Sequence, residues 1–307
     1  MATLDPNTTT HDPHEGTDWV DRVAYPFESH CIGLSAGAVH YIDEGESAPS
    51  DPTVVFLHGN PTWSFLYRHL VSGLSDDYRC VALDYLGFGL SEHPEEFSYL
   101  PSDHAALVEE FVETLELEDV VLVVQDWGGP IGLSYVADHP ENVRGLVVMN
   151  TWAWPMDDLS TRAFSWLAGG PLGRILCVRF DAFTRLVMLT AYADRSKLTP
   201  EIHEQYRRTH PPGKRTGTWV FPRAITGERE WLADLWKRLD SLRDHPALLA
   251  WGMEDPAFDP EKLRTFEVFF RNSETVEFPG VGHYIQEEAG EGLVPPVRAF
   301  LDGLDGT

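Results

Sequence analysis

Short runs of Val, Leu, Ile and Ala alternate along most of the chain with longer segments of helical pattern. Six such apolar runs lie near residues 53–57, 79–84, 119–124, 143–149, 246–251 and 274–278. Runs of this length are typical of strands buried on both faces, and the segments between them fit helical crossover connections. Alternating positions in 29–33 and 39–43 add an opening antiparallel pair. The pattern predicts an α/β fold with a mostly parallel, doubly wound, eight-stranded sheet.

The regular alternation fails between residues 155 and 228. This segment is rich in aromatic residues and leucine, and glycine and proline interrupt it. We interpret it as a helical cap inserted after the sixth strand, with most of its apolar side chains packed on the core and a minority lining a substrate pocket. The core then consists of residues 23–154 and 229–307. Trp152 and Trp154, just before the cap, are candidate pocket walls.

The most informative local pattern surrounds Asp126. The apolar run 120–124 ends in Gln-Asp-Trp-Gly-Gly, and a helical pattern follows over 130–137. A sharp turn of this kind lifts one side chain clear of the sheet, and Gly128 lets the helix backbone pass close behind it. A carboxylate there suits attack on a saturated carbon, because the ester that forms can be hydrolysed, whereas a serine would leave an ether. The alternative is that Asp126 only caps the following helix.

Three further segments supply polar residues at strand ends. His-Gly-Asn60 follows the strand at 53–57, and its turn can direct backbone N–H groups and the Asn60 amide at an anion. Asp255 follows the strand near 247–251, with Glu254 as the competing acid, and His283 follows the last strand in a Gly-Val-Gly-His turn. The chain order is therefore nucleophile, acid, histidine, unlike that of chymotrypsin or subtilisin.

With these motifs the chain resembles the haloalkane dehalogenases of the α/β-hydrolase superfamily over nearly its whole length. The matching motifs are HGNPTWSFLYR from His58, LDYLGFGLSE from Leu83, VQDWGGPIGL from Val124, WGMEDPAF from Trp251 and GVGHYIQEE from Gly280. The pattern is most similar to the subgroup with an Asp-His-Asp triad and an Asn–Trp halide site. In another subgroup a glutamate follows the preceding strand, but this chain has Asn150 there.

The resemblance implies a role for each of these side chains. Asp126 would attack the carbon that bears the halogen, while the Asn60 amide and the Trp127 indole N–H hold the departing halide. His283 would then activate water against the ester, with Asp255 orienting the histidine and the backbone N–H groups of Asn60 and Trp127 stabilising the oxyanion. The products would be a primary alcohol, a halide and a proton, with no cofactor.

Three other functions compete with this interpretation. Epoxide hydrolases share the aspartate and the histidine but need acids for the ring oxygen, typically two cap tyrosines, and Tyr192 and Tyr206 lie in the predicted cap. Such enzymes usually carry an aromatic residue where Asn60 stands. Fluoroacetate dehalogenases have arginines after the nucleophile, and Trp127-Gly128-Gly129 offers none. A non-catalytic ligand-binding protein of this fold could keep the triad but would have no use for halide donors.

The chain is strongly acidic. It has 49 Asp and Glu against 23 Lys and Arg, a formal net charge of −26. This charge disfavours nucleic acid and anionic membranes as partners. Repulsion among the carboxylates destabilises the compact state at low salt, whereas at molar salt the Debye length is about 3 Å and the repulsion is screened. We therefore expect a salt-loving host.

Other features predict a soluble, cytoplasmic protein. The apolar runs are too short to span a membrane, and residues 1–22, a polar arm with weak order, lack the basic and apolar regions of a secretion signal. Cys31, Cys80 and Cys177 have no metal-binding spacing, and three cysteines fit no disulfide framework. The expected partners are a small apolar halogenated substrate, halide and water, with homo-oligomerisation left open.

Overall fold

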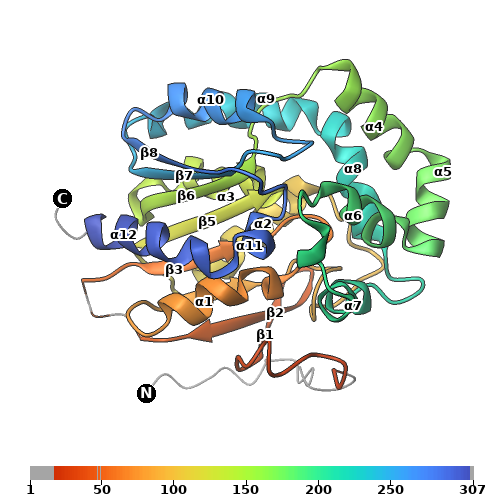
Figure 1. Cartoon of the computed structure of the whole chain (residues 1–307), viewed down its shortest axis with the longest axis horizontal. Coiled ribbons are helices and arrows are strands. Elements are labelled where there is room, and N and C mark those ends of the chain that lie inside the picture. The colour runs from red at the N-terminus through yellow and green to blue at the C-terminus, as the bar shows by residue number, and fades with distance from the viewer. Residues whose placement is uncertain (1–16, 47, 49, 305–307) are drawn as a thin grey trace.

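Eight strands form a single sheet in the order β1-β2-β4-β3-β5-β6-β7-β8 (Figure 1). The computed structural model describes residues 17–46, 48 and 50–304. β1 pairs antiparallel with β2 and β2 with β4, whereas the other neighbours are parallel, so the predicted sheet and its opening pair are confirmed. The strands are β1 (His30–Leu34), β2 (Gly37–Glu44), β3 (Thr53–Leu57), β4 (Cys80–Leu83), β5 (Val120–Asp126), β6 (Val143–Thr151), β7 (Ala247–Gly252) and β8 (Ser273–Phe278).

Alternate side chains of the central strands enter two separate apolar layers. Val120, Leu122 and Val124 of β5 belong to the layer under α2, α3, α9 and α10, whereas Val121 and Val123 belong to the layer under α1 and α12. A parallel sheet covered by helices on both faces explains why the strands are continuous apolar runs. The core helices are α1 (Arg68–Leu74), α2 (Pro101–Thr114), α3 (Gly128–Asp138), α9 (Arg229–Arg238), α10 (Pro260–Phe269), α11 (Ile285–Glu288) and α12 (Val294–Leu304), with shorter turns η1 (Ser64–Tyr67), η2 (Pro140–Asn142), η6 (Leu239–Leu242) and η7 (Gly290–Leu293).

The strand order reverses direction between β3 and β5. The strand that follows β3 in the chain, β4, lies on one side of it, and β5 lies on the other. In open α/β sheets, ligands bind in the crevice beyond the carboxyl ends of the strands at such a point. Asn60 follows β3 by three residues and Asp126 ends β5, so the topology brings two of the predicted site residues to this crevice.

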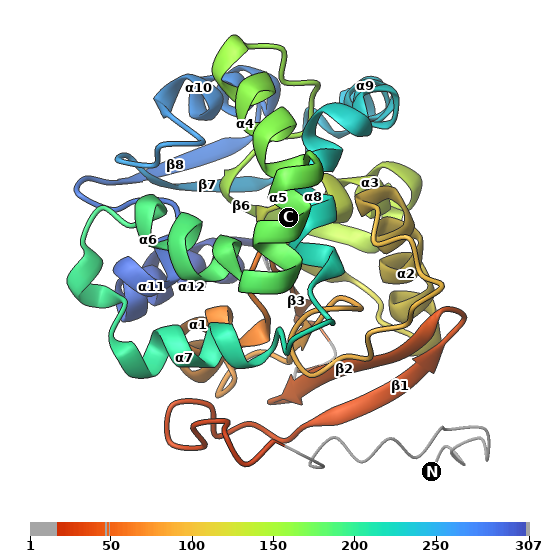
Figure 2. The same cartoon turned by 90° about the vertical axis from the view of Figure 1, so that its right-hand side faces the viewer.

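The part of the chain between β6 and α9 is mainly helical and lies to one side of the sheet (Figures 1 and 2). The predicted insertion of a helical cap after the sixth strand is confirmed. Two of its turns, η3 and η4, are π-helical, and Asp181 between them has a left-handed backbone with φ of +59°. Its elements are α4 (Leu159–Gly169), α5 (Pro171–Arg174), η3 (Ile175–Arg179), η4 (Phe183–Val187), α6 (Met188–Ala191), η5 (Arg195–Lys197), α7 (Pro200–Arg208) and α8 (Thr216–Gly227).

The predicted N-terminal arm, residues 1–22, lies mostly outside the described residues. Its last part, from residue 17, packs on the core: Val20 is buried, and the Trp19 ring lies 5.9 Å from that of Trp63. Among the described residues, no helix has the length and apolar character that crossing a bilayer requires.

Candidate active site

Asp126 lies at a sharp turn between β5 and α3. Its backbone is left-handed, with φ of +51°, which is rare for a residue with a side chain and marks a strained turn. A Cβ on Gly128 would overlap the carbonyl oxygen of Leu57, and one on Gly129 would overlap the Thr151 hydroxyl, so both positions require glycine. The Asp126 side chain does not cap α3, whose N-cap is Trp127. The alternative of a mere helix cap is therefore wrong.

The Asp126 side chain is largely but not fully buried, with 14% of its surface exposed, and the residues after β3 hold it in place. Its Oδ1 accepts the backbone N–H of Asn60 at 2.8 Å, and its Oδ2 lies 3.8 Å from His283 Nε2. Burial raises the pKa of Asp126, an effect that the charge of His283 and the N–H groups of Asn60 and Trp127 oppose. One oxygen is thus fixed by the backbone, and the other faces the histidine.

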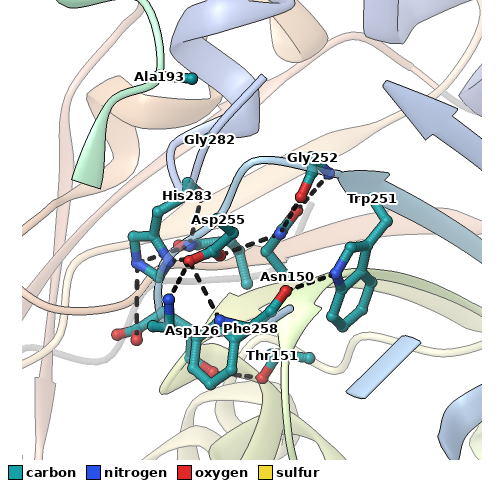
Figure 3. Close-up of polar contacts among 12 residues, drawn as sticks. Asp126, Asn150, Thr151, Ala193, Trp251, Gly252, Asp255, Phe258, Gly282 and His283 are labelled. Atoms are coloured by element: carbon teal, nitrogen blue, oxygen red, sulfur yellow. Dashed lines mark hydrogen bonds and ion pairs between the residues drawn. The ribbon is translucent and has the colours of Figure 1, made fainter. Parts of the chain in front are cut away.

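His283 and Asp255 form a hydrogen-bonded pair beside Asp126 (Figure 3). The distance from His283 Nδ1 to Asp255 Oδ2 is 2.9 Å, and Asp255 Oδ1 accepts the N–H groups of Ala257 and Phe258. Because an ionised carboxylate only accepts hydrogen bonds, Nδ1 carries the proton and Nε2 is unprotonated, with its lone pair on the side of Asp126 and Gln125. Burial alone would lower the pKa of His283, but the charge and hydrogen bond of Asp255 and the charge of Asp126 raise it. The competing acid, Glu254, is exposed.

Two amides that our sequence analysis did not assign to the site hold this pair in place. Gln125 donates to the carbonyl oxygen of His283 at 3.1 Å, and its Nε2 lies 3.2 Å from His283 Nε2. Asn150 donates to Asp255 Oδ2 and to the Gly252 carbonyl oxygen, each at 3.0 Å, and accepts the Gly252 N–H (Figure 3). Both are buried polar residues at the carboxyl ends of neighbouring parallel strands, which is the signal that could have identified them.

Asn60 and Trp127 line the same cavity as Asp126 and His283. The Asn60 amide makes one long hydrogen bond, 3.4 Å, to the Thr218 carbonyl oxygen of α8, so this donor is only weakly engaged. The cavity has a volume of about 370 Å³, and its walls are mainly apolar. Of the two tryptophans before the cap, Trp152 lines it and packs on Trp127, whereas Trp154 packs on Trp236. The other large apolar wall residues are Met156, Phe164, Phe183, Val187, Ile225 and Phe258.

The turn that carries His283 is joined directly to the cap. The His283 N–H donates to the Ala191 carbonyl oxygen at 2.9 Å. The Glu288 carboxylate accepts the N–H groups of Gly282 at 2.9 Å, Asp194 at 2.8 Å and Ala193 at 3.3 Å. Burial raises the pKa of Glu288, and these N–H groups oppose that shift. Glu288 was not among the predicted site residues, although two adjacent acids in an apolar turn after the histidine were a visible signal.

A buried ion pair forms a second contact between the cap and the core. Arg68 of α1 donates to both oxygens of Glu287, at 2.5 and 2.7 Å, and the Tyr206 hydroxyl of α7 donates to the same carboxylate. The Tyr192 hydroxyl is buried without a hydrogen-bond partner among the described residues. Neither tyrosine lines the cavity beside Asp126.

Comparison with known proteins shows the family to which the chain belongs. Residues 52–290 match the family model of the alpha/beta hydrolase fold. "Haloalkane dehalogenase 2" of Mycobacterium tuberculosis (strain ATCC 25618 / H37Rv) is 38% identical over 280 residues, which are 90% of this chain and 96% of that protein. A "Cis-3-alkyl-4-alkyloxetan-2-one decarboxylase" of Shewanella oneidensis is 32% identical over 287 residues, 90% of this chain and 89% of that protein.

Among solved structures, the haloalkane dehalogenase DbeA from Bradyrhizobium elkani USDA94 is similar, with a TM-score of 0.83 and 25% identity over 91% of this chain and 99% of that chain. The fold, the elbow aspartate and these relatives agree. The chain belongs to the α/β-hydrolase superfamily and, within it, to the haloalkane dehalogenases.

Proposed function

We propose that this protein hydrolyses haloalkanes to a primary alcohol, a halide and a proton through a covalent alkyl ester of Asp126. The observation that carries the proposal is a largely buried carboxylate at the elbow that shares one mainly apolar cavity with two neutral donors, Asn60 and Trp127. Neutral donors stabilise a diffuse anion as it forms without binding it as tightly as a fixed cation would, which favours release of the halide.

In the first step, Oδ2 of Asp126 attacks the carbon that bears the halogen. The carbon–oxygen bond forms as the carbon–halogen bond breaks, and the electron pair leaves with the halide toward the Asn60 amide and the Trp127 indole. The Asn60 backbone N–H already holds Oδ1 at 2.8 Å, so the carboxylate enters the reaction oriented. This step needs no base.

In the second step, Nε2 of His283 takes a proton from water, and the water oxygen attacks the carboxyl carbon of Asp126. Negative charge develops on Oδ1, where the backbone N–H groups of Asn60 and Trp127 stabilise it. Asp255 keeps the histidine in the required tautomer and stabilises its charged form. Collapse of the intermediate breaks the bond between the carboxyl carbon and the alkyl-bearing oxygen, which takes the proton from His283 and leaves as the alcohol. The remaining proton of the water is released, and the regenerated carboxylate contains one oxygen from water.

The oxetanone decarboxylase relatives supply a second candidate reaction, the opening of a four-membered cyclic ester. The carbon attacked would again be saturated, with a ring oxygen as the leaving group. A cavity of about 370 Å³ lies at the small end for ligand sites, which favours a compact haloalkane over a ring that carries two alkyl chains.

The other competitors find less support. The Tyr206 hydroxyl is engaged by Glu287, and neither Tyr192 nor Tyr206 reaches the cavity, so the acids expected of an epoxide hydrolase are not in position. The described residues that line the cavity include no arginine for the carboxylate of fluoroacetate. A receptor would leave the weakly engaged Asn60 amide without a purpose.

The decisive experiment is to trap the ester. His283→Phe, incubated with 1-bromobutane in high salt, should gain one butyl group by intact mass, with Asp126 as the modified residue, because the first step needs no base. Asp126→Asn is the matched control and should remain unmodified. An unmodified His283→Phe protein, from a wild type that does release bromide, would contradict the two-step scheme. Carbon dioxide from a dialkyl oxetanone, without bromide from any bromoalkane, would favour the second candidate.

A further inference from the structure

The charge of this protein is distributed unevenly between core and cap. Residues 155–228 contain eleven Lys and Arg against seven Asp and Glu, so the rest of the chain has 12 basic and 42 acidic residues. The cap is therefore a region of net positive charge on a strongly acidic molecule. The net charge of the whole chain therefore does not describe the surface of the cap.

The exposed apolar side chains are just as uneven. Of eleven large hydrophobic residues that are exposed in the described part of the chain, nine lie between residues 159 and 186, and the other two are Val23 and Val268. The six most exposed of the nine are Leu159, Trp166, Leu167, Leu172, Phe180 and Leu186, at 58–83%. We call this surface, on α4, α5, η3 and η4, the cap outer face. In Figure 2, α4 and α5 cross the front of the molecule.

The cap outer face exposes a large apolar area within one short segment of the chain. Taking about 200 Å² for a fully exposed large side chain, the nine residues expose roughly 1,000 Å², whereas the largest apolar patch of a typical monomer is about 300–600 Å². The same face carries Arg162, Arg174, Arg179 and Arg185, all exposed. The one acid in this stretch, Asp181, is buried. Asp181 forms an ion pair with Arg185 at 3.4 Å, whereas Arg162, Arg174 and Arg179 form none among the described residues. The surface thus combines aliphatic and indole side chains with three unpaired cations.

We propose that the cap outer face binds the surface of an anionic lipid bilayer, with Trp166 and the leucines at the level of the acyl chains and the arginines at the phosphates. A bilayer satisfies both halves of the chemistry, apolar and cationic. The acidic core does not prevent this contact, because the Debye length is about 8 Å at physiological salt and α4 and α5 lie at the edge of the molecule (Figure 1).

A second copy of the chain fits less well. Two cap outer faces in contact would bring the arginines of both copies together with no exposed acid from either stretch to pair with them. A cap outer face set against the acidic core of another copy would pair the arginines, but the described part of the core exposes just Val23 and Val268 as large apolar residues. Neither arrangement of two copies satisfies both the apolar side chains and the arginines of the cap outer face.

The position of this surface relative to the cavity suggests its purpose. Phe164 of α4 is exposed at 39% among the outer residues and also lines the cavity that contains Asp126. Apolar substrates concentrate in bilayers, so a cap resting on the lipid would place the cavity wall near its substrate supply. The binding itself does not depend on the reaction, and it can be tested without any substrate.

The test is flotation with vesicles of phosphatidylcholine containing about 30% phosphatidylglycerol, compared with phosphatidylcholine alone. The wild type should float with the anionic vesicles, and more weakly in 1 M KCl. Leu159→Ser combined with Trp166→Ser and Phe180→Ser should lower the bound fraction about tenfold, and Arg162→Gln with Arg174→Gln and Arg179→Gln should remove its salt dependence. Val268→Ser, an equally exposed apolar residue on α10, is the matched control and should float normally.

A second measurement locates the contact. Spin-labelled lipid should quench the fluorescence of Trp166, so quenching should fall sharply in Trp166→Phe. A wild type that stays in solution with both vesicle types would overturn the proposal, as would flotation that survives the apolar substitutions. A dimer by light scattering that the same substitutions dissociate, without flotation of the wild type, would assign the face to a second copy instead.

Discussion

The sheet edge and the cap hold the two sides of one cavity by different means. On the sheet side, Asp126 ends β5 and Asp255 follows β7, and backbone N–H groups fix both carboxylates. On the cap side, Phe164 and Val187 come from short helical elements whose outer surface is open to solvent. Buried strand ends allow little movement, whereas lightly packed helices allow more. We therefore expect sheet-side substitutions to change the rate of the chemistry and cap-side substitutions to change substrate affinity.

The largest effect should come from Asp255→Asn. The amide would present a donor to His283 and favour the wrong tautomer, and the corresponding change in a serine protease costs about 10⁴-fold. We expect a loss on the order of 10³–10⁴-fold in kcat, mainly in ester hydrolysis, so that one equivalent of halide is released rapidly before turnover slows. Quenched-flow measurement of bromide would show this burst. Val187→Ala, on the cap side, should instead change KM by a few-fold, and a comparable fall in kcat there would break the comparison.

The next largest effect should come from Trp127→Phe, which keeps the aromatic packing and removes one donor. Loss of an oxyanion-type donor costs on the order of 3 kcal/mol, so kcat/KM should fall at least tenfold. Trp152→Phe is the matched control, since Trp152 lines the same cavity and packs on Trp127, while its buried indole N–H has no partner in the described structure. Equal losses in the two variants would mean that the indoles act through packing alone.

The same contrast explains what the sequence could predict. Asp126, Asp255 and Asn60 were predictable because strand ends, glycine turns and chain order determine where such residues lie. The cap wall was not, because Phe164 and Val187 reach the cavity through packing of short helices that no periodic pattern specifies. The cap was predicted as an element, and its wall residues were not.

A third group of residues, Gln125, Asn150 and Glu288, was only partly predictable. Gln125 and Asn150 hold His283 and Asp255, and Glu288 holds Gly282 next to His283, through hydrogen bonds that depend on the register of neighbouring elements. Their polarity is visible in the sequence, but their partners are not, because a partner is set by which strand or turn lies alongside.

We expect a smaller effect on activity from Glu288→Gln. Glu288 connects the turn that carries His283 to the cap. The carboxylate charge contributes to the raised pKa of His283, so its removal should lower that pKa. Ester hydrolysis needs neutral His283 and is lost as pH falls through its pKa. The acid limb of the kcat profile should therefore move to lower pH, with a KM increase of a few-fold because the 193–194 segment of the cap loses part of its anchor. Glu254→Gln is the control, because Glu254 is an exposed acid beside Asp255. If the acid limb of Glu288→Gln did not move, Glu288 would have a structural role and no effect on the pKa of His283.

The smallest effect, a change in stability alone, concerns the charge difference between the two regions. Carboxylate repulsion is concentrated outside the cap, with 42 acidic against 12 basic residues there, so screening should stabilise mainly the core. We expect the melting temperature to rise by several degrees between about 0.1 and 2 M KCl. Most of the rise should come below about 1 M, because the Debye length falls from about 10 Å to about 3 Å over that range and changes little afterwards. Sucrose at equal osmolality separates screening from solute exclusion, which stabilises proteins without regard to charge. A melting temperature that stays flat in KCl, or that rises equally in sucrose, would mean that the acidic surface has no part in holding the core together at high salt.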